Sequence, residues 1–180
     1  MNKSNFAKSV QLFNNAILAR VFHQTLVEIS QEKLTAVQVS CIRFVHLHSE
    51  PSVGAIADGL AISNAASAKL VDRLVRKKFL TREEDQKDRR VLKIKLTPSG
   101  KQLLQEILDR ESELFQRILA RMTPETVEAL RSGIVGFLQA ALEAPGQIDE
   151  VCLHCGVEHT PDCIGNLLYR ELTGNDKKQV

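Results

Sequence analysis

The chain has 180 residues, of which 43% are hydrophobic, and a formal net charge of +2. These values are typical of a globular protein with one domain and room for an appendage. No stretch approaches the roughly 20 continuous apolar residues that a membrane-spanning helix needs, and polar side chains interrupt residues 1–11, which therefore do not resemble a signal peptide. We expect a cytoplasmic protein with no membrane partner.

The first predicted element is a long amphipathic helix between Asn5 and Ile29, where apolar residues recur near the helical period. Three further helices are predicted from their start signals. Thr35 forms a capping box with Gln38, and Ser52 and Ser63 are N-cap residues. The helix after Ser63 carries its apolar side chains on one side and most of its basic side chains on the other.

A change of period follows this helix. Residues 79–82 and 91–96 predict two short strands, and the polar residues 83–90 form the tip of the hairpin between them. Thr97-Pro98 and Thr123-Pro124 then start two long helices, because Pro is favoured at the first helical position. Pro145-Gly146 is expected to end the second of these helices.

Positive charge is concentrated between Lys69 and Lys101, where 12 Lys and Arg stand against 5 Asp and Glu, a local charge of +7. The remaining chain has 12 basic and 17 acidic residues and therefore a charge of −5. A solvated helix face and a surface for phosphate backbones both fit this distribution. The order of the elements around the basic segment favours the second interpretation.

That order, a helix, a short helix, a turn, a basic helix and a two-stranded hairpin, is that of a winged helix-turn-helix. We therefore predict a mainly α (α+β) fold. An α-helix fits the DNA major groove, where each base pair presents a distinct pattern of donors and acceptors. A basic hairpin can reach the adjacent minor groove, whose negative potential attracts Arg. The sequence thus predicts double-stranded DNA as a partner.

Residues 34–100 resemble the MarR family of bacterial transcription regulators. The most specific matches are LVDRL at 70–74, DRR at 88–90 and LTPSG at 96–100, in this order and spacing. The resemblance implies a winged helix-turn-helix domain at 35–100 between dimerisation segments at 1–34 and 101–146. It further implies a homodimer that binds an inverted-repeat operator, most often as a repressor, and it leaves a small-molecule effector open.

The resemblance also implies which residues contact DNA. Those expected to face the major groove are Ser63, Asn64, Ala65, Ser67 and Lys69. Arg73 and Lys77 suit phosphate contacts. In the wing, Asp88 would hold Arg90 by an ion pair while Arg89 enters the minor groove. For Arg73 and Arg90, an internal salt bridge is an equally open interpretation.

Residues 147–180 form a tail that the resemblance leaves unexplained. The tail carries the pattern C-x2-C-x3-H-x3-C, and its candidate ligands are Cys152, Cys155, His159 and Cys163. Zinc is the expected metal, because so short a tail, with few large apolar side chains before Cys163, can hardly fold without a staple. An iron–sulfur cluster on the Cys residues is one alternative, and a redox dithiol or no site is the other. The apolar spacing after Cys163 predicts a short helix that docks the tail on the main body.

Two functions from different classes remain in view. The main body offers no nucleophile–base pair, glycine-rich phosphate loop or carboxylate pair, so we do not expect an enzyme. The leading hypothesis is a DNA-binding regulator that responds to metal or redox state through the tail. The alternative is a small metal or thiol-redox protein that uses the winged helix as a scaffold. Cys41 lies on an apolar stripe and is expected to be a core residue.

Overall fold

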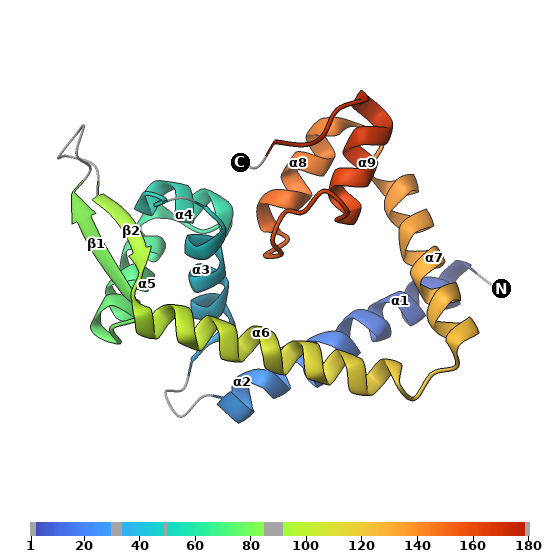
Figure 1. Cartoon of the computed structure of the whole chain (residues 1–180), viewed down its shortest axis with the longest axis horizontal. Coiled ribbons are helices and arrows are strands. Elements are labelled where there is room, and N and C mark those ends of the chain that lie inside the picture. Colours follow the sequence, from blue (N-terminus) through green and yellow to red (C-terminus); the bar gives the residue numbers. More distant parts are fainter. Residues whose placement is uncertain (1–2, 30–33, 49, 85–91, 179–180) are drawn as a thin grey trace.

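The computed structural model describes residues 3–29, 34–48, 50–84 and 92–178. The elements in chain order are α1 (Lys3–Ile17), the π-helical segment η1 (Leu18–His23), α2 (Gln24–Ile29), α3 (Ala36–Leu47), α4 (Val53–Gly59), α5 (Asn64–Arg76), β1 (Leu80–Glu84), β2 (Leu92–Leu96), α6 (Pro98–Leu119), α7 (Pro124–Ala141), α8 (Pro145–His154) and α9 (Ile164–Thr173). Helices α3–α5 and the two strands gather at the start of α6, while α7 leads away from its other end and carries α8 and α9 (Figure 1). The predicted mainly α fold with a small sheet is confirmed.

The predicted start signals all cap helices. In each case a Ser or Thr hydroxyl accepts a hydrogen bond from the amide three residues later, which satisfies one of the free donors at a helix N-terminus. The donor and acceptor residues are Gln38 and Thr35, Ala55 and Ser52, Ala66 and Ser63, Gly100 and Thr97, and Thr126 and Thr123. The Gln38 side chain also accepts from the Thr35 amide, which completes the capping box. These short polar side chains therefore fix where the helices begin.

The two strands form an antiparallel hairpin that is attached to the helical core. Leu80 pairs with Leu96 and Glu84 with Leu92. Ile94 is fully buried, and its amide donates to the carbonyl of Pro51 at 3.0 Å, so β2 is also joined to the segment that leads into α4. The wing is thereby held at a defined position beside the helices.

One hydrophobic core joins these elements. Its fully buried side chains include one or more from each of α3, α4, α5, β2 and α6, namely Ile42, Ile56, Val71, Leu74, Ile94 and Ile107. Gly100 in the first turn of α6 lies so close to β1 that a Cβ atom there would be 2.1 Å from the carbonyl oxygen of Phe79. The glycine of the LTPSG motif is therefore required for the close approach of α6 to the wing.

The structure corrects two expectations about helix ends. The N-terminal helix is not a regular α-helix throughout, because η1 interrupts it between α1 and α2. Pro145-Gly146 does not end the preceding helix: α7 already ends at Ala141, and Pro145 is the first residue of α8. Proline lacks the backbone N–H that a helix start leaves unbonded, so it fits the first position of a helix well. The tail predicted at 147–180 therefore begins within a helix.

Helix α4 packs against α3 at Gly59. A Cβ atom on Gly59 would lie 1.9 Å from the ring of Phe44, well inside van der Waals contact. The ring of Phe44 in turn stacks on that of His48 with a centroid distance of 3.8 Å. Gly59 thus allows α4 to approach an aromatic pair that a larger residue would exclude.

We predict that Gly59→Ala lowers the free energy of unfolding by about 1–3 kcal/mol, because overpacking a tight contact forces neighbouring groups to move. Gly146→Ala is the matched control, since a Cβ there meets nothing within 4 Å. Thermal or urea unfolding measures both variants. Equal stability of the two would contradict the close contact between α3 and α4.

Candidate nucleic-acid interface

The first turns of α5 present a row of polar and small side chains to solvent. Ser63, Asn64, Ala65 and Lys69 are all exposed. The side chain of Ser63 also caps the helix, so the α5 N-terminus has a fixed direction. A helix end with this exposure can enter a major groove with its N-terminal residues at the base edges.

Ser67 does not belong to this exposed row. It is fully buried, and its hydroxyl donates to the carbonyl of Val53 in α4 at 2.8 Å. The expectation that Ser67 faces the major groove is therefore wrong: its side chain points towards α4. A small polar residue fits here because it takes little space between the two helices and its buried hydroxyl has an acceptor in the Val53 carbonyl. Helical spacing puts Ser67 on the inner side of α5, three and four residues before the buried Leu70 and Val71, but it does not indicate the bond to Val53.

The outer side of α5 carries the basic residues. Arg73 is exposed and makes no ion pair with any residue within the described ranges. Lys77 is half-buried at the end of the helix, where its amide closes the last turn by bonding to the carbonyl of Arg73. The wing is attached to the same helix, since Arg82 of β1 forms an ion pair with Asp72 at 2.5 Å. This pair joins the wing to the basic surface of α5 and neutralises the charge of Arg82.

Part of the positive charge of this surface is already neutralised. Lys95 of β2 pairs with Glu50 and Glu83, both at 2.7 Å, and Lys93 pairs with Glu50 at 3.2 Å. Hydrogen bonds from Lys95 and then Lys93 lower the pKa of the Glu50 carboxyl, while the bonds to Glu50 and Glu83 raise the pKa of Lys95. Because Glu50 lies outside the basic segment, the local charge counted from sequence overstates what is available to a phosphate backbone.

The three predicted wing-tip residues, Asp88, Arg89 and Arg90, lie outside the described residues. Their roles in an ion pair and in the minor groove stay predictions.

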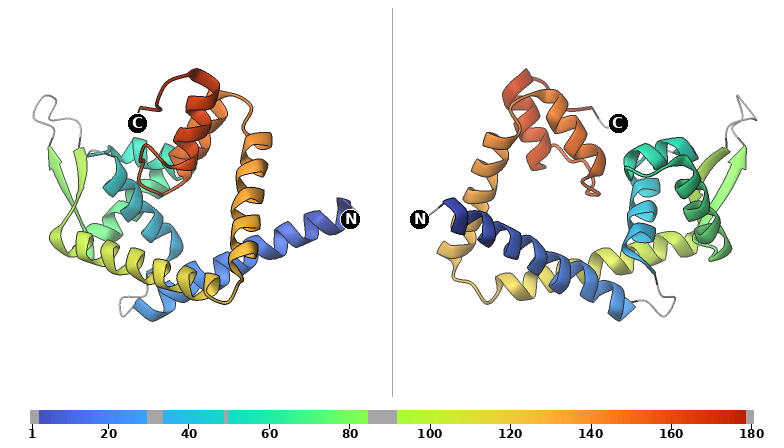
Figure 2. Two further views of the ribbon diagram at one scale, coloured as in Figure 1. Left: turned by 45° about the vertical axis from the view of Figure 1, so that its right-hand side comes forward. Right: turned by 180° about the vertical axis from the view of Figure 1, so that it is seen from behind.

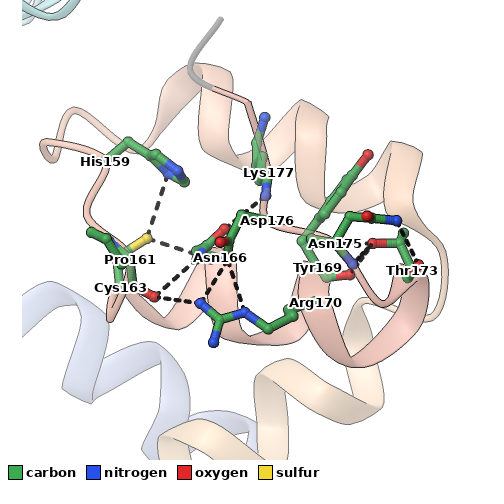
Figure 3. Close-up of polar contacts among 10 residues, drawn as sticks. All are labelled: His159, Pro161, Cys163, Asn166, Tyr169, Arg170, Thr173, Asn175, Asp176 and Lys177. Carbon is green, nitrogen blue, oxygen red and sulfur yellow. Dashed lines mark hydrogen bonds and ion pairs between the residues drawn. The ribbon is translucent and has the colours of Figure 1, made fainter.

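The tail is an ordered pair of helices rather than a bare loop. The fully buried Asn166 of α9 is its organising residue: the side-chain amide donates to the Pro161 carbonyl and to Asp176, both at 2.9 Å, and the side-chain oxygen accepts from the Lys177 amide at 2.8 Å (Figure 3). Ile148 and Leu168 are buried between the helices. The expected short helix after Cys163 is present. Helix α8 and the Asn166 network add ordered structure that the sequence did not indicate, and the expectation that the tail needs a metal staple stays a prediction.

The four Cys and His residues of the tail are brought near one another without forming a closed site. Cys163 caps α9, and its Sγ lies 3.4 Å from the Asn166 amide and 3.7 Å from His159 Nδ1 (Figure 3). The Sγ of Cys155 instead points to the Val157 carbonyl at 3.6 Å. In the part of the chain that the structure describes, no three His, Cys, Asp or Glu side chains stand together as metal ligands.

Even so, all four residues line one cavity of about 220 Å³. Cys152 extends over the first turn of α9, where a Cβ atom on Gly165 would lie 2.8 Å from its Sγ. Burial raises the pKa of the Cys152 thiol, and the nearby thiols of Cys155 and Cys163 raise it further. Cys41, by contrast, is fully buried in the main core, where burial raises its pKa to about 12, so the expectation of a core residue is confirmed.

The tail contacts the helix-turn-helix directly. His154, at the end of α8, lies with its Nδ1 2.7 Å from the carbonyl oxygen of Gly59, and the adjacent Leu153 packs on the main core. Beside this contact, a cavity of about 410 Å³ lies between η1, α3 and the tail. Across it, Arg43 of α3 forms a largely buried ion pair with Glu111 of α6 at 2.5 Å. The sequence patterns indicated neither the His154 contact nor this ion pair, because both join residues far apart in the chain.

None of the helices formed by the described residues combines the length and the hydropathy needed to cross a bilayer.

Comparison with known proteins identifies relatives of this arrangement. Residues 33–91 match the family model described as MarR family. The chain is 26% identical over 116 residues to the HTH-type transcriptional repressor MdtR of Bacillus subtilis, covering 64% of this chain and 75% of the relative. The crystal structure of the Bacillus subtilis YusO protein matches with a TM-score of 0.64 and 23% identity, and the match covers 78% of this chain and 99% of that one. The crystal structure of MepR, a transcription regulator of the Staphylococcus aureus multidrug efflux pump MepA, matches with a TM-score of 0.66 and 19% identity, and this match also covers 78% of this chain and 99% of that one. A MepR variant bound to an oligodeoxyribonucleotide also matches, with a TM-score of 0.57, 20% identity, and coverage of 76% of this chain and 97% of that one.

We predict that Ser67→Ala lowers the free energy of unfolding by about 1 kcal/mol, since it removes a buried hydrogen bond between α5 and α4. Its preference among DNA sequences should stay that of the unmodified chain. Asn64→Ala should do the reverse and alter sequence preference with little loss of stability. Thermal unfolding together with competition binding on operator variants measures both effects. A changed base preference in Ser67→Ala would contradict the buried position of this residue.

Proposed function

We propose that this chain is a MarR-family winged helix-turn-helix transcriptional regulator, that it represses its target genes as a homodimer on an inverted-repeat operator, and that its tail adjusts operator binding to metal or redox state. The observation that carries DNA binding is the exposed, Ser63-capped N-terminus of α5 beside the basic surface of Arg73 and Lys77. Repression is supported by the relative MdtR, which is named a transcriptional repressor.

This proposal also decides between the two classes of function that the sequence left open. A small metal or thiol-redox protein has no need of a capped, solvent-facing helix with a basic flank. MdtR is named a transcriptional repressor and MepR a transcription regulator, which favours the DNA-binding class. The cavity beside the Arg43–Glu111 pair has room for a small-molecule effector between the winged helix and the N-terminal helix.

Dimerisation is supported by apolar side chains that the single chain leaves uncovered. Helix α7 contains no buried residue, and Phe137 in its C-terminal half is 59% exposed. Helix α1 crosses α7 (Figure 2), and it likewise exposes Phe6, Val10, Leu12 and Phe13. An apolar groove of about 1040 Å³ runs between α1, α6 and α7. Exposed apolar surface of this extent is typical of an interface, and a second copy of the chain would cover it.

We predict a dimer, twice the 20.1 kDa chain mass, by light scattering at micromolar concentration. Phe137→Glu should shift the protein towards monomer, because a charge placed in an apolar interface must be desolvated. Leu172→Glu makes the same change at an exposed position of α9, away from this groove, and should leave the dimer intact. A monomeric unmodified chain would overturn the proposed homodimer.

We predict that Arg73→Ala weakens binding to all duplexes alike and reduces the slope of log affinity against log salt by about one unit, as expected for one lost phosphate contact. Arg131→Ala removes the same charge from α7, where Arg131 pairs with Glu128, and should leave the slope unchanged. Fluorescence anisotropy on the DNA upstream of the protein's own gene, at several salt concentrations, measures both. An unchanged slope in Arg73→Ala would contradict the phosphate contact.

A further inference from the structure

The Cys/His residues of the tail are the largest group of metal-ligating side chains that the winged helix does not use. We propose that Cys152, Cys155, His159 and Cys163 bind one Zn²⁺ ion per chain, and that this ion sets the contact between the tail and α4. Zinc would be the signal for the regulation proposed above. Only the effect of zinc on operator binding rests on that proposed function, whereas the zinc site does not.

The pair His159 and Cys163 already has the spacing of two ligands on one metal ion. Their Nδ1 and Sγ atoms are 3.7 Å apart. Tetrahedral zinc, with Zn–S of about 2.3 Å and Zn–N of about 2.0 Å, places such atoms roughly 3.5 Å from each other. Zinc therefore needs no large movement of these two side chains.

The environment of Cys163 suits a thiolate. Its Sγ caps the N-terminus of α9, a helix of 10 residues, and lies 3.4 Å from the Asn166 amide. Helix N-termini stabilise negative charge, and a backbone N–H directed at a coordinated sulfur orients it for the metal. The same turn of α9 lacks a side chain at Gly165, which gives Cys152 Sγ room to lie over it.

Cys152 and Cys155 have to move towards the His159–Cys163 pair, because no three of these side chains stand together as ligands in the described residues. The Cys155 thiol is exposed and directed at the Val157 carbonyl, yet the residue lines the same cavity as the other three. The turn between Cys152 and Cys155 is followed by Gly156 at φ +65°, a conformation that favours glycine. The exposed Cys155 thiol and the glycine after the turn would let the CxxC half close on the His159–Cys163 pair.

Three thiolates, one neutral imidazole and a divalent cation together carry one negative charge. The charged groups around the cavity fit a site with this charge. Lys177 lines the cavity, and only 6% of its side chain is exposed. Its ammonium pairs with Asp149 at 2.7 Å. A buried cation beside the cavity would offset the net negative charge of the occupied site.

The site is coupled to the DNA-binding unit through His154, which lies between Cys152 and Cys155 in the sequence. The His154 ring bonds to the Gly59 carbonyl, at the end of the helix that braces α5. When Cys155 turns to the metal, the chain on both sides of His154 is fixed. Zinc would thus control how firmly the tail holds α4.

The first experiment measures zinc on the full-length chain, purified without oxygen and titrated against a competing chelator. We expect about one equivalent in the unmodified chain and loss of binding in Cys155→Ser and Cys163→Ser. Serine is itself a good helix N-cap, so Cys163→Ser keeps the start of α9 while removing the ligand. Cys41→Ala removes a thiol from the main core and should still bind zinc. Circular dichroism checks that each variant is folded.

Three results would overturn the site. Iron with acid-labile sulfide, found in place of zinc, would show that the tail holds an iron–sulfur cluster. Three freely reacting tail thiols with no metal would leave a redox dithiol or an inert tail. Zinc retained in both serine variants would show that other residues hold it.

The second experiment separates the site from its regulatory role. Zinc should change operator affinity of the unmodified chain by about fivefold or more, within the usual range of coupling between two sites. His154→Ala should still bind one equivalent of zinc but lose this response. An equal response in His154→Ala would overturn the coupling through Gly59. A chain that binds zinc but no DNA would instead overturn the proposed function and leave the metal site standing.

Discussion

The contact between the Phe44 ring and the bare Cα of Gly59 is the constraint on which the DNA-binding unit depends. Because Gly59 has no side chain, α4 can lie against α3 close enough for the core to include Ile56. Helix α4 then accepts the hydroxyl of Ser67, which sets the direction of α5. The carbonyl of the same glycine meets His154 of the tail. One small residue therefore joins the core, the helix that would read DNA and the C-terminal segment.

Local signals in the sequence predicted most of the main body. Each helix start from Thr35 to Thr123 was predicted because a capping side chain acts on an amide three residues away, and no distant part of the chain is needed for that bond. The hairpin could be predicted in the same way, since the alternation of apolar and polar residues in its strands and the polar tip between them are local features. The exposed end of α5 followed from the helix start at Ser63. Side chains whose role depends on a neighbouring helix, such as Ser67, could not be assigned in this way.

The tail shows where local patterns stop being sufficient. Pro145 suits both the end of one helix and the start of the next, so α8 was overlooked. Asn166 is a polar residue in a short helix, and only the fold reveals that its amide replaces the apolar contacts the segment lacks. The spacing of the Cys and His residues predicts that they lie close together, and they line one cavity, but the spacing does not indicate the direction of the Cys155 thiol. Side-chain direction depends on packing, which a spacing pattern does not contain.

The absence of any buried residue in α7 has a genetic consequence. If a second copy of the chain covers this helix, subunits are exchangeable parts, and a cell with two alleles assembles mixed pairs. A chain damaged in α5 but intact in α7 would still pair with normal subunits. Such mixed dimers would not bind DNA properly, so the allele would be dominant. A chain damaged in α7 would be left out of every pair, and its allele would be recessive. The two surfaces of this protein can thus be told apart by inheritance alone.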